Sequence, residues 1–234
     1  MHWSNTFFAH WRVPAAPLAS HLPDGLRLEL HRGEAWVSIA AMRVRGPFPG
    51  PFPPPPLDPV FAVDQISIRT YVIGPEGPGV FLLDSVLNGR IAAFMGRQAG
   101  LPYRYSRSTH VHRGAQTLSV LSPGLSVYGD LGPTLRLARP GSRLHFLSER
   151  YRVYTQLPGG FALGSLTIAH DPWRLRRVEL GTSLPSSIAG FPGSADPALV
   201  LAGASDLHVT VSHVASHTAP IVRELREMAT ELTH

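Results

Sequence analysis

One arginine lies in an apolar stretch of the chain, and its neighbours could bind a small anion with it. The sequence QISIRTYVIG places Arg69 between Ser67 and Tyr71. Alternate residues of an extended strand share a face, so these three side chains point one way while Ile66 and Ile68 point the other. A guanidinium binds a carboxylate through two parallel hydrogen bonds, which suits a small acid or an enolate. Two interpretations stay open: Arg69 lines a ligand pocket, or it forms a structural ion pair.

Three further residues, together with Arg69, are the predicted catalytic set. Asp84 could act as a general base with a pKa raised by burial, or it could cap the helix that follows. Glu149 could pair with Arg69 or act as an acid or base. His170, in the sequence HDPW, could shuttle a proton at the mouth of a pocket, or it could form a hydrogen-bonded turn.

Other polar side chains could line the same site. In the sequence SERYRVYT, strand alternation places Glu149 and Tyr151 on one face, and Arg150 and Tyr154 on the other. The two tyrosines could hydrogen-bond a ligand or pack with a solvated hydroxyl group. The predicted ligand-binding residues are Gln65, Ser67, Tyr71, Arg150, Tyr151 and Tyr154.

No metal and no cofactor are expected. The chain has no cysteine, and its histidines do not follow a recognised metal-ligand spacing, although His110 and His112 share a strand face and three others lie at positions 208, 213 and 217. No phosphate-binding loop, dinucleotide fingerprint or nucleophile elbow occurs. The GPEGPG segment at 74–79 is typical of a hairpin turn.

The basic residues exclude one mechanism. All 21 basic residues are arginine, so no lysine side chain can form a Schiff base with a carbonyl substrate. The arginines are spread along the chain rather than clustered, which argues against nucleic-acid binding despite a net charge of +5. No apolar run reaches the roughly 18 residues of a membrane span, and the aromatic N-terminus does not resemble a secretory leader. A cytoplasmic protein is expected.

The elements that would position these residues are mostly short strands. The clearest hairpin joins 66–73 to 80–84, and a second is predicted between 26–31 and 34–45, around Arg32 and Gly33. A proline-rich loop is expected at 46–59, and a helix at 86–99 with Leu87, Ile91, Phe94 and Met95 at helical spacing. Further strands are predicted at 103–111, 116–121, 125–128, 134–138, 143–154, 161–169 and 207–213, with a loop at 181–198.

This pattern predicts an α+β protein of mainly antiparallel β structure, with a barrel-like or sandwich-like sheet and few helices. We expect one domain over 1–215. Residues 216–234 are expected to form an amphipathic C-terminal helix packed on the same domain.

Several short motifs in order resemble the DUF2071, or YqjF-like, family of unknown function. They include HW-R-V (10–13), G-x-A-W-V (33–37), M-R-V-R-G (42–46), I-R-T-Y-V (68–72), E-R-Y-R-V-Y-T (149–155) and H-D-P-W-R-L (170–175). The resemblance implies an acetoacetate-decarboxylase-like fold around a small-molecule pocket. Relatives commonly carry an acidic residue and an asparagine where this chain has Gln65 and Ser67, so the polarity of the pocket would differ here.

The sequence therefore predicts a protein that holds a small organic acid or carbonyl compound in a pocket. It could be an enzyme that uses acid–base chemistry without a Schiff base. The alternatives are a non-catalytic binding protein or sensor, and a structural module in which the face of Arg69 meets a partner chain. No nucleic-acid or membrane partner is expected, and a homo-oligomer stays open.

Overall fold

The computed structural model describes residues 1–46, 62–160, 162–182, 184, 187–188, 191–192 and 197–218. The proline-rich segment predicted to be a loop lies outside these residues, except for Gly46. The helix predicted over 216–234 is wrong at its start, because residues 216–218 belong to the strand Thr210–Thr218, and the rest of it lies outside the described residues.

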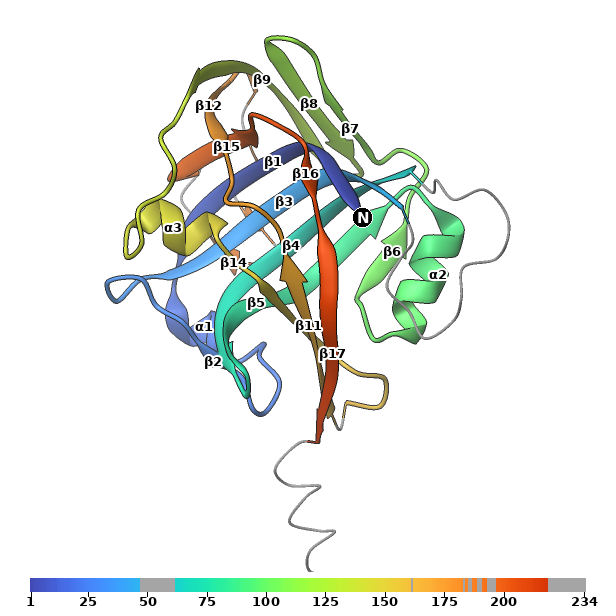
Figure 1. The fold of residues 1–234 in the computed structure, drawn as a ribbon. Helices are drawn as coiled ribbons and strands as arrows, with labels where there is room; N and C mark the ends of the chain where they lie inside the picture. Colours follow the sequence, from blue (N-terminus) through green and yellow to red (C-terminus); the bar gives the residue numbers. More distant parts are fainter. Residues whose placement is uncertain are drawn as a thin grey trace, which may run out of the picture.

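A mainly antiparallel sheet organises the described residues (Figure 1). Its strands are β1 (His2–Val13), β2 (Arg27–Leu28), β3 (Ala35–Arg45), β4 (Ala62–Gly74), β5 (Gly77–Leu87), β6 (Tyr103–Tyr105), β7 (His110–Arg113), β8 (Thr117–Ser122), β9 (Leu125–Thr134), β10 (Arg152–Gln156), β11 (Ala162–Ala169), β12 (Leu175–Leu180), β15 (Leu199–Gly203), β16 (Leu207–His208) and β17 (Thr210–Thr218). A separate pair joins β13 (Ser187–Ile188) to β14 (Phe191–Pro192). The described helices are α1 (Ala15–Ala19), α2 (Arg90–Gln98) and α3 (Arg143–Ser148).

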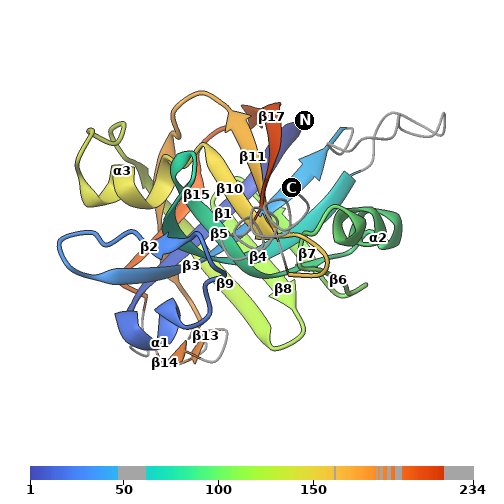
Figure 2. The ribbon, with the colours of Figure 1, turned by 90° about the horizontal axis from the view of Figure 1, so that it is seen from below.

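The predicted fold class is confirmed, but the sheet is open. Its strands follow the order β17-β11-β10-β5-β4-β3-β1-β15-β12-β9-β8-β7, with β16 beside β1, β2 beside β4 and β6 beside β5. Among the described strand pairs, only β10–β5 and β5–β6 are parallel. The sheet curls without closing, so the barrel-like expectation holds only loosely. Helices α1 and α3 lie toward one end of the sheet and α2 toward the other (Figures 1 and 2).

The central strands β1 and β3 are covered on both faces. Phe7 and Trp11 of β1 pack into one apolar cluster, while Phe8 of β1 packs into another. A strand buried on both sides needs apolar residues at most consecutive positions, and Ala35–Met42 is buried throughout and apolar except at Ser38. Strand β1 was not predicted from the sequence, because a run such as FFAHW lacks the alternation that marks a half-buried strand.

The hairpin that carries Arg69 is confirmed, with longer strands than predicted. Strands β4 and β5 pair from Gln65–Leu87 to Gly74–Gly77, with a shift in register after Ile68. The hairpin predicted between 26–31 and 34–45 forms only as a single antiparallel bridge between His31 and Glu34. The turn at Arg32 and Gly33 does form, and both residues have positive φ angles. However, the segment before it pairs with β4 through β2, while β3 pairs with β1 and β4.

The helix predicted at 86–99 needs two corrections, one to its start and one to its buried face. Strand β5 continues to Leu87, so α2 begins only at Arg90, after Gly89 as N-cap, and neither Asp84 nor Ser85 caps it. The buried face of α2 consists of Ala92, Ala93 and Gly96, whereas Ile91 and Phe94 are exposed. Small residues face the sheet because the Tyr103 ring lies directly against Gly96.

The segment predicted as one strand over 143–154 instead forms α3 followed by β10. The Ser142 hydroxyl accepts a hydrogen bond from the backbone N–H of His145 and so caps α3. This local cap turns the chain away from strand geometry before the sheet resumes at Arg152.

Candidate functional site

The candidate site is built on a row of residues that crosses three neighbouring strands. His10 of β1 lies opposite Ser38 of β3, and Ser38 lies opposite Arg69 of β4. Directly paired residues of an antiparallel sheet point to the same face, so the three side chains stand side by side. Tyr71, two residues after Arg69, points to that face as well. The sheet register therefore brings together residues that are far apart in the sequence.

His10, Ser38 and Tyr71 form a closed hydrogen-bond network. The Ser38 hydroxyl lies 2.6 Å from Nδ1 of His10 and 2.6 Å from the Tyr71 hydroxyl, and the His10 and Tyr71 atoms are 3.1 Å apart. Tyr71 also donates a 3.0 Å hydrogen bond to the carbonyl of Leu147 in α3. All three side chains are fully buried. Helix α3 thus fixes the ends of side chains that rise from the sheet.

Burial and charge shift the ionisation of this network. Burial lowers the pKa of His10 well below its ordinary value, and the positive charges of Arg69 and Arg143 lower it further. Burial also raises the pKa of Tyr71, an effect that Arg69 partly offsets. At neutral pH both groups are therefore uncharged, and the positive charge of the site belongs to its arginines.

The charge of Arg69 is only partly compensated by hydrogen bonds and ion pairs. Its Nε and Nη2 atoms are buried and have no hydrogen-bond partner, and no carboxylate among the described residues forms an ion pair with it. Its guanidinium lies 5.3 Å from the centre of the Phe8 ring. Burial lowers the pKa of Arg69, while the nearby Tyr71 favours its charged form. A cation–π contact on one side leaves hydrogen-bond donors for an anion.

A second polar chain lies one row away on the same face. Ser67 is paired with Ser85 of β5, and their hydroxyl groups are 2.9 Å apart. Gln65 donates a 2.9 Å hydrogen bond to Ser67 and accepts one of 3.3 Å from the hydroxyl of Tyr103. Burial raises the pKa of Tyr103 to about 12, so this chain is neutral. These side chains extend the polar part of the sheet face beside Arg69.

Arg150 supports the site through ordinary pairing. Its Nη1 donates a 2.6 Å hydrogen bond to Glu29, and its Nε donates one of 2.6 Å to the carbonyl of Phe146. Its guanidinium also stacks near the rings of Phe146 and Tyr71, at 4.3 and 5.1 Å. All these contacts tie α3 to the sheet. Unlike Arg69, Arg150 is engaged by a carboxylate.

Glu149, Tyr151 and His170 form a neighbouring group around Trp173. Glu149 is buried and accepts hydrogen bonds from the backbone N–H of Trp173, at 3.0 Å, and from the hydroxyl of Tyr151, at 2.6 Å. Burial, and then this carboxylate, raise the pKa of Tyr151. The His170 ring contacts Tyr151 and Trp173, with centroids 4.7 and 5.2 Å apart. Trp173 meets Phe8 edge-on, with ring centroids 5.2 Å apart. This group therefore contacts the same Phe8 ring that lies beside the Arg69 guanidinium.

Two predicted site residues lie away from Arg69. Asp84 is the neighbour of Ser85 in β5 and so points to the opposite face, where it forms an ion pair with Arg104. Tyr154 donates a 2.9 Å hydrogen bond to the carbonyl of Gly77 and accepts one of 3.2 Å from the N–H of Glu76. It therefore fastens the β4–β5 turn.

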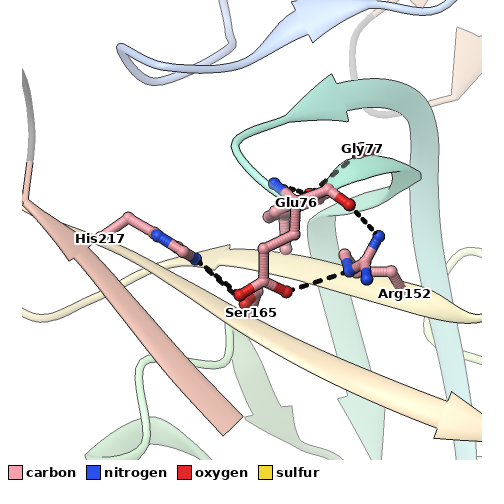
Figure 3. Close-up of polar contacts among 6 residues, drawn as sticks. Glu76, Gly77, Arg152, Ser165 and His217 are labelled. Carbon is pink, nitrogen blue, oxygen red and sulfur yellow. Dashed lines mark hydrogen bonds and ion pairs between the residues drawn. The ribbon is translucent and has the colours of Figure 1, made fainter. Parts of the chain in front are cut away.

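The same turn is held by a cluster of polar contacts around Glu76 (Figure 3). Glu76 lies between Arg152 of β10, at 3.1 Å from Nε, and His217 of β17, at 3.1 Å from Nε2. His217 Nε2 is also 3.3 Å from the hydroxyl of Ser165 in β11. Because one ring nitrogen faces both Glu76 and Ser165, the arrangement lacks the relay through two ring nitrogens of a nucleophilic triad. We call these four residues the turn clamp.

The described part of the chain was searched for metal sites, for membrane-spanning helices and for surface hollows. No group of three or more His, Cys, Asp or Glu residues there is placed to hold a metal ion. No helix in the same residues is long and apolar enough to cross a bilayer. An open hollow of about 770 Å³ is lined by Ser108, His110, residues 121–126 and Leu184, and it includes none of the predicted site residues.

Sequence reasoning missed His10 and Ser38. His10 stands in the motif HW-R-V and is the one ionisable residue within FFAHW, but that position alone does not place it beside Arg69. Only the pairing of β1 with β3 and of β3 with β4 does so.

Comparisons with known proteins agree with this architecture. The family model DUF2071, described as an uncharacterized conserved protein, matches residues 1–205. The uncharacterized protein YqjF of Bacillus subtilis (strain 168) is 26% identical over 191 residues, which cover 78% of this chain and 76% of YqjF.

Solved structures show the same fold at low sequence identity. Acetoacetate decarboxylase from Legionella pneumophila superposes with a TM-score of 0.61 at 14% identity, over 91% of this chain and 85% of that one. The enduracididine biosynthesis enzyme MppR complexed with pyruvate gives 0.58 at 13% identity, over 93% and 89%. The chain thus has an acetoacetate-decarboxylase-like fold, and it belongs to the DUF2071 family.

Proposed function

We propose that this protein binds a small organic carboxylate, or a carbonyl compound in its enolate form, on the sheet face that carries Arg69. One observation carries the proposal: Arg69 keeps two buried guanidinium nitrogens without a hydrogen-bond partner. Burying a charge without compensation is costly, and an anion bound in a bidentate fork would compensate this one. The polar neighbours Ser38, Ser67 and Tyr71 are neutral, so none of them neutralises the charge of the arginine, and Ser67, which accepts hydrogen bonds from Gln65 and Ser85, keeps its own proton for the anion.

The chemistry proposed for this site does not use an imine. MppR, a neighbour of the same fold, is described in complex with pyruvate, which supports a small keto acid or a related acid as the class of ligand. This chain has no lysine, so binding would rest on the guanidinium and on hydrogen bonds. If catalysis occurs, Arg69 would stabilise an oxyanion while a nearby group moves a proton next to a carbonyl.

A non-catalytic binding protein or sensor is the second candidate. It is favoured by the state of two predicted acid–base groups: Glu149 uses both oxygens in hydrogen bonds, and Asp84 pairs with Arg104 on the other face. Incubation with each binding compound, followed by NMR of the small molecule, separates the candidates. Turnover would identify an enzyme, whereas binding without change would identify a sensor or carrier.

The binding proposal is tested by thermal shift with a panel of small acids, including acetate, propionate, pyruvate, acetoacetate and lactate. A ligand at about 100 times its Kd should stabilise the protein by about 2.7 kcal/mol. Arg69→Met should lose this stabilisation. Arg12→Met is the matched control, since Arg12 is exposed and paired with Glu34. Equal stabilisation of the wild type and Arg69→Met would place the anion elsewhere.

A further inference from the structure

Within the proposed anion site, we propose that the ligand carries a hydroxyl group beside its anionic group, and that Nε2 of His10 accepts a hydrogen bond from that hydroxyl. The inference rests on the proposed function for the anion, which Arg69 would hold. It adds a second recognition point, and with it a narrower ligand class: a small hydroxy acid, or the enol form of a keto acid.

The number of protons in the buried network assigns the tautomer of His10. Tyr71 has one hydroxyl proton, and it is donated to the carbonyl of Leu147, which can only accept. The 2.6 Å contact between Tyr71 and Ser38 must then use the proton of Ser38. Ser38 then has no proton left for its 2.6 Å contact with Nδ1 of His10, so Nδ1 must carry the proton and donate it to Ser38. His10 is therefore the Nδ1–H tautomer, and Nδ1 also faces the Tyr71 oxygen at 3.1 Å.

The other ring nitrogen of His10 is then a bare acceptor. Its Nε2 atom is fully buried and has no hydrogen-bond partner. Burial and the nearby charges of Arg69 and Arg143 oppose protonation of the ring, so Nε2 stays an acceptor at neutral pH. A buried acceptor without a donor is costly and uncommon in folded proteins, and a ligand hydroxyl group would satisfy this one.

His10 and Arg69 present complementary groups on one face of the sheet. Both lie directly opposite Ser38, one on each side of β3. Both also approach the Phe8 ring: the His10 ring lies nearly parallel to it at 6.1 Å, and the Arg69 guanidinium lies 5.3 Å away. One residue thus offers donors and the other an acceptor, beside a shared apolar surface.

This pair of groups discriminates among small acids. A carboxylate supplies acceptors for Arg69 but has no donor for His10. A keto acid adds another acceptor, which Nε2 cannot bind. A hydroxy acid or an enol supplies the missing O–H. A site that hydrogen-bonds a hydroxyl group rejects analogues that lack it, because the buried partner is otherwise left unpaired.

The test compares matched acids by isothermal titration calorimetry with the full chain. The first series is lactate, pyruvate and propionate, and the second is 3-hydroxybutyrate, acetoacetate and butyrate. In at least one series we expect the hydroxy acid to bind roughly tenfold or more tightly than the alkanoic acid, which corresponds to one buried hydrogen bond. Equal affinity throughout both series would overturn the inference and leave the proposed anion site intact. Absence of binding by every acid would instead overturn the proposed function, and this inference with it.

His10→Asn is the informative variant. The Asn amide can occupy the position of Nδ1 and donate to Ser38 and Tyr71, but it removes the acceptor at the position of Nε2. We expect this variant to bind all three acids of the discriminating series with similar affinity. Retention of the hydroxyl preference in folded His10→Asn would overturn the inference.

A measurement on the wild type covers the case in which His10→Asn does not fold. Long-range ¹H–¹⁵N correlation spectra of the imidazole distinguish protonated from bare ring nitrogens. We expect Nδ1 of His10 to be protonated and Nε2 to be bare in the free protein, with the Nε2 resonance shifting on addition of the hydroxy acid. A protonated Nε2 in the free protein would overturn the assignment.

Discussion

A guanidinium that is buried without hydrogen-bond partners makes the ligand-free protein less stable than it could be. Arg69 fits this description at Nε and Nη2, whereas Arg150, close to the same Tyr71 ring, is satisfied by Glu29 and the carbonyl of Phe146. Two arginines on neighbouring elements therefore differ in role. Unsatisfied polar groups of this kind concentrate at functional sites, where stability is exchanged for recognition.

Replacing Arg69 by methionine should therefore stabilise the ligand-free protein. Methionine has a similar length and no charge, and replacing buried charges by apolar residues is often neutral or favourable by about 1–4 kcal/mol. We expect the free energy of unfolding in urea to rise by about 1 kcal/mol. If Arg69 instead formed a structural ion pair, the same change would lower it by about 3–5 kcal/mol.

His10 should make stability depend on acid pH. The unfolded imidazole takes up a proton near pH 6.5, while burial, Arg69 and Arg143 resist protonation in the folded state. Below pH 6.5 the unfolded state therefore binds more protons, and stability falls as pH decreases toward the lowered pKa. Urea unfolding between pH 5 and pH 8 should show that the free energy of unfolding falls more steeply with decreasing pH for the wild type than for His10→Asn. Parallel pH profiles would mean that folding leaves the pKa of His10 unchanged.

Tyr103 should have the corresponding effect at alkaline pH. Burial raises its pKa from 10.0 to about 12, so the folded state keeps the proton that the unfolded state releases. Its contribution is complete below pH 10 and disappears as pH rises to 12, with a total of about 3 kcal/mol. We expect the stability of the wild type to fall more than that of Tyr103→Phe between pH 9 and pH 11, measured by urea unfolding.

At the scale of elements, the sequence predicted best where one local signal decides the structure. The β4–β5 hairpin follows from alternating residues around a Gly-Pro turn, and it is confirmed. Strand β1 was missed because burial on both faces removes the alternation. The apolar spacing of Ile91 and Phe94 predicted the wrong buried face of α2, since close packing of Gly96 on Tyr103 outweighs side-chain hydrophobicity there.

The turn clamp joins elements that the sequence does not link. Glu76 connects the β4–β5 turn to β10 and β17 through Arg152 and His217 (Figure 3). Glu76→Gln keeps the shape of the side chain and removes its charge. Because the contacts of Glu76 with Arg152 and His217 are partly exposed, we expect the free energy of unfolding to fall by about 1 kcal/mol.

The matched control for the clamp is Glu34→Gln, which removes a more exposed ion pair with Arg12. It should change the free energy of unfolding by less than about 0.5 kcal/mol. Amide hydrogen exchange should also become faster in β17 of Glu76→Gln and stay unchanged in Glu34→Gln. Equal effects of the two substitutions would mean that the clamp contributes no more than a surface pair.

At the scale of the molecule, the sequence could place Arg69 on a strand face with Ser67 and Tyr71, but it could not find His10 and Ser38. Those residues are separated from Arg69 by tens of positions, and only the order β1-β3-β4 makes them neighbours. Strand order depends on long-range packing, which no local pattern encodes. The ordered motifs could predict the fold, because a family resemblance carries the topology with it.

The continuity of the sheet predicts how the whole molecule unfolds. The strand path runs without a break from β17 to β7, but the parallel contact between β5 and β10 is short, with only Val153–Val80 and Tyr154–Phe81 in register. The turn clamp and Tyr154 reinforce that contact from the side. We therefore expect one cooperative transition in urea, with coincident curves from tryptophan fluorescence and far-UV circular dichroism.

Disruption of the clamp should test that continuity most directly. In Glu76→Gln the strands β10, β11 and β17 lose part of their attachment, while Trp11 and Trp36 stay in cores beside β1 and β3. If the sheet is one cooperative unit, the two curves will shift together to lower urea concentration. A circular-dichroism transition that precedes the fluorescence transition in the wild type would contradict a single cooperative unit.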